Sequence, residues 1–191
     1  MVLNLGILIS QNGSNMLNIV KACHEKKIQA NVKIVISNNP DSKGLKKLKI
    51  FKTKSKILLL KDFKNKKAYE EEINELFKKN NVNFICLAGY MKILERDFLE
   101  KWKKRIINIH PSLLPSFKGL EPQKQAIEKK VKFSGCTIHY VNDNIDDGEI
   151  IDQSIVKVDK KETVESLKKK ILLEEHKLYI SVLTKISKVL K

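Results

Sequence analysis

Short apolar runs alternate along this chain with longer segments in which apolar residues recur at helical spacing. The runs that predict buried strands cover residues 2–9, 30–37, 57–60, 83–88 and 106–109. The segments that predict helices between them cover residues 16–27, 42–48 and 65–80. Strands that alternate with helices in this way indicate right-handed βαβ units and a parallel sheet.

The pattern changes in the last third of the chain. A helix is predicted over residues 121–130, then two strands over 133–142 and 149–158, and a long closing helix over 163–189. The two strands are joined by an acidic, glycine-containing loop, which favours an antiparallel excursion from the parallel sheet. We therefore expect an α/β fold: a Rossmann-like open twisted sheet, mostly parallel with antiparallel C-terminal strands, and helices on both faces. We expect one domain over residues 1–191.

The most informative stretch is the strand at residues 106–109 and the irregular segment that begins at Pro111. Side chains alternate between the faces of a strand, so Asn108 and His110 should point one way and Ile107 the other. In open α/β sheets, ligands bind at the carboxyl ends of strands. An amide and an imidazole are therefore expected side by side at a binding edge.

These two side chains suit acyl transfer, in which a carbonyl becomes a tetrahedral oxyanion. Asn108 can donate to an oxygen that gains negative charge, and a protonated His110 can do the same or deliver a proton. The structural alternative is that Asn108 caps a turn while His110 bonds a nearby backbone carbonyl. The spacing alone leaves both interpretations open.

The acidic loop at residues 143–148 offers a carboxylate, Asp146, that could lie beside this pair. A carboxylate next to an imidazole orients the ring and favours its protonated form; alternatively, the loop is only a hairpin turn. A metal site built from His110, His139, His176 and Asp146 is a rival interpretation. No pair of these residues has close ligand spacing, so we predict no metal.

The loop at residues 10–15 follows the first strand and precedes the first predicted helix. That layout presents backbone N–H groups to a phosphate, although an ordinary turn has the same appearance. The loop lacks the Gly-Lys-Ser/Thr ending of a P-loop and the three glycines of the dinucleotide fingerprint.

The composition is strongly basic, with 38 Lys and Arg against 22 Asp and Glu and a net charge of +16. The lysines are spread along the whole chain with few aromatic residues among them, which favours compositional bias over a nucleic-acid surface. Neither a membrane span nor a basic leader is visible, so we expect a cytoplasmic protein. The three scattered cysteines, Cys23, Cys86 and Cys136, are expected to be buried reduced thiols.

The central motif Asn108-Ile-His-Pro-Ser-Leu-Leu-Pro115, followed by Asp146-Asp-Gly148, resembles the signature of the folate-dependent formyltransferases. The segments 12–15, 37–38 and 87–94 are similar to one branch of that family, the phosphoribosylglycinamide formyltransferases of purine synthesis. The resemblance runs from residue 3 to about residue 180.

The resemblance implies a reaction and a role for each member of the motif. The formyl group of 10-formyltetrahydrofolate, a co-substrate, would pass to the amine of glycinamide ribonucleotide, with no metal. Asn108 and His110 would stabilise the oxyanion, and His110 would donate the proton that helps expel the folate nitrogen. Asp146 would hold His110 protonated and order a proton-shuttling water.

The resemblance also implies the binding residues. Those for the nucleotide are Gly13, Ser14 and Asn15 at the phosphate and Glu175 at the glycinamide amine. Those for the folate are Lys66, Met91, Lys92, Ile93, Leu94 and Asn108. The expected partners are these small molecules only, with the protein a monomer or homodimer.

Three rival functions make different demands on the sequence. Methionyl-tRNA formyltransferase would carry a further C-terminal domain, for which we expect no room in 191 residues. A formyltetrahydrofolate hydrolase would carry an extra N-terminal domain and a second histidine in place of Ile109 or Pro111. A basic nucleic-acid binding module would show clustered Lys and Arg with interleaved aromatics, and the scattered lysines argue against it.

Overall fold

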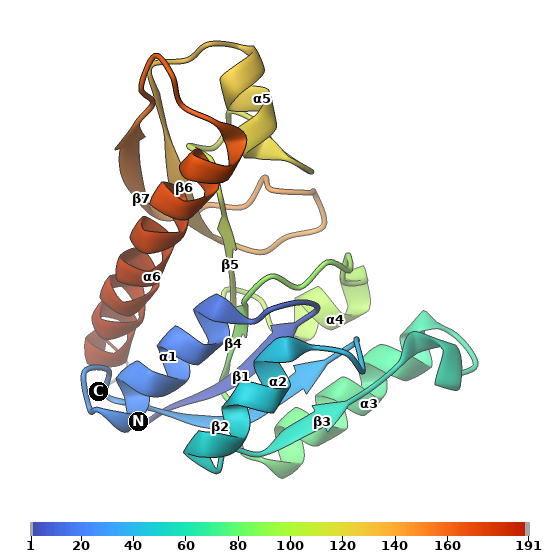
Figure 1. Ribbon diagram of the computed structural model, residues 1–191. Helices are drawn as coiled ribbons and strands as arrows, with labels where there is room; N and C mark the ends of the chain where they lie inside the picture. The colour runs from blue at the N-terminus through green and yellow to red at the C-terminus, as the bar shows by residue number, and fades with distance from the viewer. Residues whose placement is uncertain (1, 190–191) are drawn as a thin grey trace.

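The structure is a computed structural model that describes residues 2–189, which form one mixed sheet covered by helices (Figure 1). The seven strands are β1 (Leu3–Ile9), β2 (Ala30–Ser37), β3 (Ser55–Ile57), β4 (Phe84–Leu87), β5 (Ile106–His110), β6 (Phe133–Tyr140) and β7 (Ile150–Lys157). The α-helices are α1 (Ser14–His24), α2 (Lys43–Leu48), α3 (Lys66–Lys79), α4 (Arg96–Lys101), α5 (Pro122–Glu128) and α6 (Val164–Val189). The two short 3₁₀ helices are η1 (Lys49–Phe51) and η2 (Leu60–Asp62).

The strand order is β3-β2-β1-β4-β5-β6-β7. The first five strands in this order are parallel, and β6 and β7 pair antiparallel at one end. The prediction of a mostly parallel open sheet with antiparallel C-terminal strands is confirmed. The chain moves outward from β1 through β2 to β3, then returns to place β4 on the other side of β1, so a topological switch point lies between β1 and β4.

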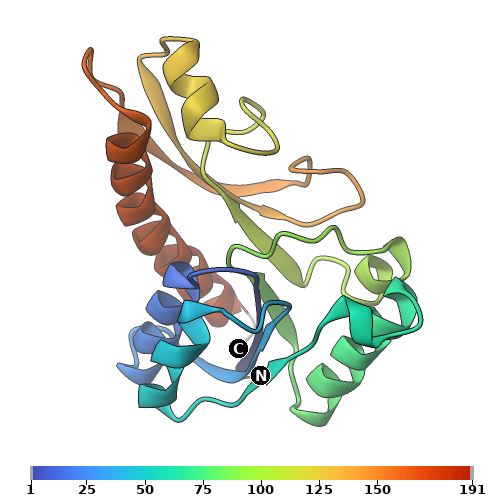
Figure 2. The same cartoon turned by 45° about the vertical axis from the view of Figure 1, so that its right-hand side comes forward.

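Helices cover both faces of the sheet, as expected. One core cluster joins β1 to α1, α5 and α6, and a second joins the other face to α3 and α4. Figure 2 shows α3 and α4, in green, on the opposite side of the sheet from α6, in red. The alternation along β5 fits this layering, because Ile107 and Ile109 belong to the first cluster and Ile106 belongs to the second.

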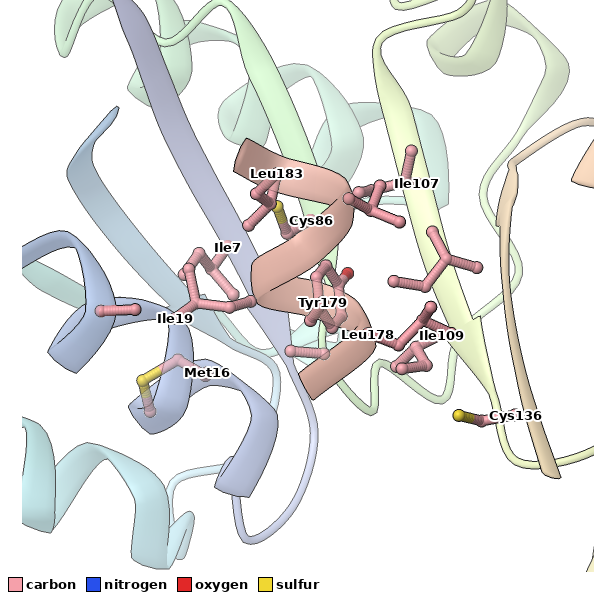
Figure 3. Packing of buried hydrophobic residues seen from close by; sticks show 14 of the residues in the cluster. Ile7, Met16, Ile19, Cys86, Ile107, Ile109, Cys136, Leu178, Tyr179 and Leu183 are labelled. Carbon is pink, nitrogen blue, oxygen red and sulfur yellow. The ribbon is translucent and has the colours of Figure 1, made fainter. Parts of the chain in front are cut away.

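The long helix α6 packs between α1 and β5 in the first cluster (Figure 3). Tyr179 is fully buried there and donates a hydrogen bond of 2.9 Å to the carbonyl of Leu87. Cys86 is buried beside it, and burial raises the pKa of this thiol, which keeps it protonated. All three cysteines are free thiols, as expected; Cys86 and Cys136 are buried, but Cys23 is only half-buried, contrary to the expectation.

The structure differs from the predicted elements in two places. The third strand is β3 at Ser55–Ile57, before the segment 57–60 that the apolar run indicated, and all three of its residues are exposed. Helix α4 was not predicted; its six residues are too few to establish a helical period. No helix within residues 2–189 is both long and apolar enough to cross a membrane.

Candidate active site

A cavity of about 480 Å³ lies at the carboxyl ends of β4 and β5, a size typical of small-molecule sites. Its walls come from the loop after β4, the end of β5, the segment 119–122, and the end of β6 with the loop that follows. Asn15 from α1 and Glu175 from α6 complete it. The cavity is therefore at the edge of the sheet where the sequence placed the binding site.

Asn108 and His110 line this cavity from the same face of β5. The antiparallel ladder sets Asn108 opposite His139 and His110 opposite Thr137, so β6 contributes to the same face. His110 is buried with 5% of its surface exposed. The prediction that an amide and an imidazole stand together at the strand end is confirmed.

Two acceptors flank the imidazole of His110. Its Nδ1 lies 3.2 Å from Oδ2 of Asp146, and its Nε2 lies 2.9 Å from the carbonyl oxygen of Phe117. A carboxylate and a carbonyl only accept hydrogen bonds, so both bonds form together only when the ring carries both protons. This surrounding suits a general acid.

Asp146 lies at the centre of the loop between β6 and β7, with a left-handed backbone at φ 50°. The same Oδ2 that faces His110 also accepts a hydrogen bond of 2.9 Å from the backbone N–H of Gly119. Lys118 forms an ion pair with Asp147 beside it. These bonds join the segment after β5 to the loop after β6 and hold the Asp146 carboxylate against the imidazole.

His139 is a site residue that the sequence offered only as a possible metal ligand. Its Nδ1 lies 2.8 Å from the carbonyl oxygen of Tyr140, and its Nε2 lies 3.3 Å from Nδ2 of Asn108. Burial lowers the pKa of His139, which favours the neutral ring. Alternation along β6 puts His139 on the same face as Thr137, but nothing in the sequence showed that β6 would pair with β5.

At the opposite wall, Asn15 and Glu175 are both buried and joined by a hydrogen bond of 2.6 Å from Nδ2 of Asn15 to Oε2 of Glu175. Burial raises the pKa of Glu175 above its usual range. Oδ1 of Asn15 is buried without a hydrogen-bond partner among the described residues. Gly13 and Ser14 lie just before Asn15, at the start of α1, outside the residues that line the cavity.

The predicted folate residues divide into two groups. Met91, Lys92, Ile93 and Leu94 all line the cavity, as does Asn108. Lys66 does not: it begins α3, where its Nζ lies 3.9 Å from Glu70. The structure therefore brings the segment after β4 to the site but places Lys66 elsewhere.

Within residues 2–189, no group of three or more His, Cys, Asp or Glu side chains is arranged to hold a metal ion. The histidines that converge on the cavity, His110 and His139, instead make hydrogen bonds to backbone carbonyls. A reaction without a metal stays a prediction.

Comparison with known proteins gives the family. Residues 3–183 match the sequence profile of the formyl transferases. A phosphoribosylglycinamide formyltransferase of Bacillus subtilis is 36% identical over 177 residues, which are 93% of this chain and 91% of that protein. The trifunctional purine biosynthetic protein adenosine-3 of Bos taurus is 38% identical, but the chain spans only 18% of its length.

Solved structures agree with the sequence comparison. Glycinamide ribonucleotide transformylase 1 from Symbiobacterium toebii superposes with a TM-score of 0.95 at 37% identity, covering 98% of this chain and 88% of that one. A phosphoribosylglycinamide formyltransferase from Anaplasma phagocytophilum gives a TM-score of 0.91 at 39% identity, with the same coverage of both chains. The resemblance carried by the Asn108–Pro115 motif is confirmed, and the chain belongs to the formyl transferase family.

Proposed function

We propose that this protein transfers the formyl group of 10-formyltetrahydrofolate to the amine of glycinamide ribonucleotide, a step of purine (IMP) biosynthesis. The observation that carries the proposal is the set of groups around His110. A carboxylate lies at its Nδ1 and a carbonyl at its Nε2, and the Asn108 amide lies two residues earlier on the same face of β5. Membership of the formyl transferase family supports the reaction class. A cytoplasmic location and a reaction without a metal are part of the proposal.

The nucleotide would bind along the wall formed by α1 and α6. The first N–H groups of a helix lack intrahelical partners and favour an anion, so the start of α1, at Gly13, Ser14 and Asn15, suits the ribose phosphate. No acidic side chain in the first turn of α1 opposes a phosphate. The glycinamide amine would then meet two acceptors, the carboxylate of Glu175 and the Oδ1 of Asn15, which has no hydrogen-bond partner within residues 2–189.

The folate would bind on the opposite side, along the segment after β4. Met91 and Ile93 line the cavity and are 53% and 58% exposed. A flat heterocyclic ring would cover them and gain their burial. The backbone of Met91 is itself held, since its N–H donates a 2.8 Å hydrogen bond to Ser10 at the end of β1.

In the proposed reaction the amine attacks the formyl carbon, a new C–N bond forms, and the carbonyl oxygen becomes an oxyanion. The Asn108 amide and the protonated His110 would donate to this oxyanion, a contribution of roughly 2.7–4 kcal/mol for each donor. The bond from carbon to N10 of the folate then breaks, and N10 takes a proton from the imidazolium. The attacking amine loses one proton, which returns to His110, so protons balance over the cycle.

His110 must expose an N–H for these steps. Its Nδ1 is held by Asp146, while its Nε2 bonds a backbone carbonyl that a substrate oxygen or nitrogen could replace. We therefore assign proton delivery to Nε2 and orientation of the ring to Asp146. General acid catalysis of this kind contributes about 100- to 10,000-fold in rate.

A spectrophotometric assay of formyl-folate, with and without glycinamide ribonucleotide, tests the proposal. We expect formyl-folate to disappear only with the nucleotide, and His110→Ala to abolish this loss while His24→Ala, a histidine at the end of α1, leaves it unchanged. Loss of formyl-folate without the nucleotide would identify a hydrolase instead. No turnover, combined with tight salt-sensitive binding to RNA or DNA, would make the +16 charge the functional feature and overturn the proposal.

A further inference from the structure

The Asn108 amide has two ends of similar shape and opposite chemistry. Its NH₂ group donates and its oxygen accepts, and a half-turn about the terminal torsion exchanges them. Only the NH₂ end can stabilise an oxyanion; the oxygen end would repel it. A catalytic asparagine therefore needs a neighbour that selects one of the two orientations.

His139 has the properties of that neighbour. The carbonyl oxygen of Tyr140, 2.8 Å from Nδ1 of His139, can only accept, so the ring proton is on Nδ1. In the neutral ring Nε2 is then a bare acceptor, and it lies 3.3 Å from Nδ2 of Asn108. An acceptor in this position favours the NH₂ end of the amide and disfavours the oxygen end.

The Tyr140 carbonyl that fixes this tautomer is itself held in place. A Cβ added to Gly148 would lie 1.6 Å from that oxygen, so the loop packs directly on it and only glycine fits. The N–H of Tyr140 donates 2.9 Å to the carbonyl of Glu149, which closes the same turn. The backbone around His139 thus has little freedom to offer a different partner.

We propose that His139 is a positioning residue, which acts through its unprotonated Nε2 to hold the Asn108 amide with one N–H on His139 and the other free for the oxyanion. This inference rests on the proposed formyl transfer. His139 itself would not touch the reacting atoms. Its role is to keep the Asn108 donor facing the cavity that both side chains line.

The charged groups near His139 bear on whether its Nε2 stays unprotonated and can accept a hydrogen bond. Asp146 lies 3.8 Å from Nε2 of His139, and His110 is the other titratable side chain nearby. Protonation of Nε2 would turn it from an acceptor into a donor toward Asp146, and the amide of Asn108 would then present its oxygen to the ring. Burial opposes that protonation.

A double-mutant cycle measures the coupling. We expect His139→Phe to lower kcat by about tenfold or more with a small change in the KM of either substrate, since loss of one oxyanion donor costs about 100- to 1,000-fold. In an Asn108→Ala background, His139→Phe should have no further effect, because its action passes through Asn108. His139→Gln, which retains an acceptor, should keep more activity than His139→Phe and serves as the second variant should the first not fold. His24→Phe is the matched control.

Imidazole ¹⁵N NMR tests the same geometry without any turnover. We expect the neutral Nδ1–H tautomer of His139 at pH 7.5, and a shift of its Nε2 resonance in Asn108→Ala. An Nε2–H tautomer, an imidazolium, or equal effects of His139→Phe with and without Asn108 would overturn the inference. Absence of nucleotide-dependent turnover in the unaltered chain, with the Nδ1–H tautomer present, would instead refute the proposed reaction and leave the positioning geometry intact.

Discussion

The Oδ2 of Asp146 lies 3.2 Å from the Nδ1 of His110 and also accepts the N–H of Gly119 at 2.9 Å. One carboxylate oxygen thereby orients the imidazole and is itself oriented by backbone from another segment. The side chain of Asp146 is 11% exposed, so water screens the pair weakly. The charge of this carboxylate should therefore matter for catalysis more than its shape.

Asp146→Asn tests that expectation. The amide oxygen can still accept from Gly119, but the negative charge beside the imidazole of His110 is lost. We expect kcat to fall by about 100-fold or more, with little change in KM for either substrate. The control is Asp147→Asn, which removes a neighbouring carboxylate that pairs with Lys118 outside the cavity and should leave kcat nearly unchanged. Equal losses in the two variants would argue against a specific role for Asp146.

Glu175→Gln tests the nucleotide wall. The substituted side chain can still accept from Asn15 but offers no negative charge to an amine. We expect KM for glycinamide ribonucleotide to rise about tenfold, a loss of about 1.4 kcal/mol in binding, while KM for the folate stays the same. Glu174→Gln is the control, since Glu174 bonds Ser154 and Lys177 away from the cavity. A change in folate KM alone would contradict this assignment.

Glu70 predicts a stability effect that depends on pH. Both of its carboxylate oxygens accept from the N–H of Glu95, at the start of α4, and burial raises its pKa from 4.5 to about 6. Between pH 4.5 and about 6, Glu70 is still protonated in the folded state but has lost its proton in the unfolded chain. The free energy of unfolding that Glu70 contributes therefore falls as the pH rises through this window. Above it, the charged Glu70 costs roughly 1–2 kcal/mol.

Glu70→Gln should remove that cost and keep the hydrogen bond to Glu95. Urea unfolding at pH 4.5, 6 and 8 should show a variant that is more stable than the unaltered chain at pH 8 and equal to it at pH 4.5. Glu71→Gln, an exposed neighbour that pairs with Lys101, should show no such pH dependence. A Glu70→Gln variant that is less stable at pH 8 would mean that the charge stabilises α4.

Gly6 on β1 predicts a packing effect. A Cβ at this position would lie 2.5 Å from the ring of Phe77, so the contact between β1 and α3 cannot accept even a methyl group without movement. We expect Gly6→Ala to lower the free energy of unfolding by about 1–3 kcal/mol. Phe77→Leu should relieve the clash, so the double variant should be more stable than the sum of the single losses predicts. Strict additivity in denaturant unfolding would show that the ring moves aside freely.

Much of this arrangement could be predicted from local pattern alone. Alternation along 106–109 placed Asn108 and His110 on one face, because side-chain direction in a strand depends only on position. The contribution of the acidic loop and of the segment after β4 to the site was predicted from sequence motifs that lie close to strand ends. The parallel direction of the first five strands followed from strand–helix alternation.

What could not be predicted depends on contacts between distant segments. The pairing of His139 with Asn108 is set by the register between β5 and β6, which no local pattern encodes. Lys66 was expected at the cavity, but its position depends on how α3 packs, and the structure places it beside Glu70. Strand β3 was misplaced because its exposed side chains carry no burial pattern.

The most direct test of the proposed reaction follows the formyl carbon itself. The protein is incubated with glycinamide ribonucleotide and 10-formyltetrahydrofolate labelled with ¹³C in the formyl group, and the products are resolved by ¹³C NMR. We expect the label to appear in a formamide on the glycinamide nucleotide, at a rate that collapses in His110→Ala. Label recovered as free formate, or left on the folate, would contradict it.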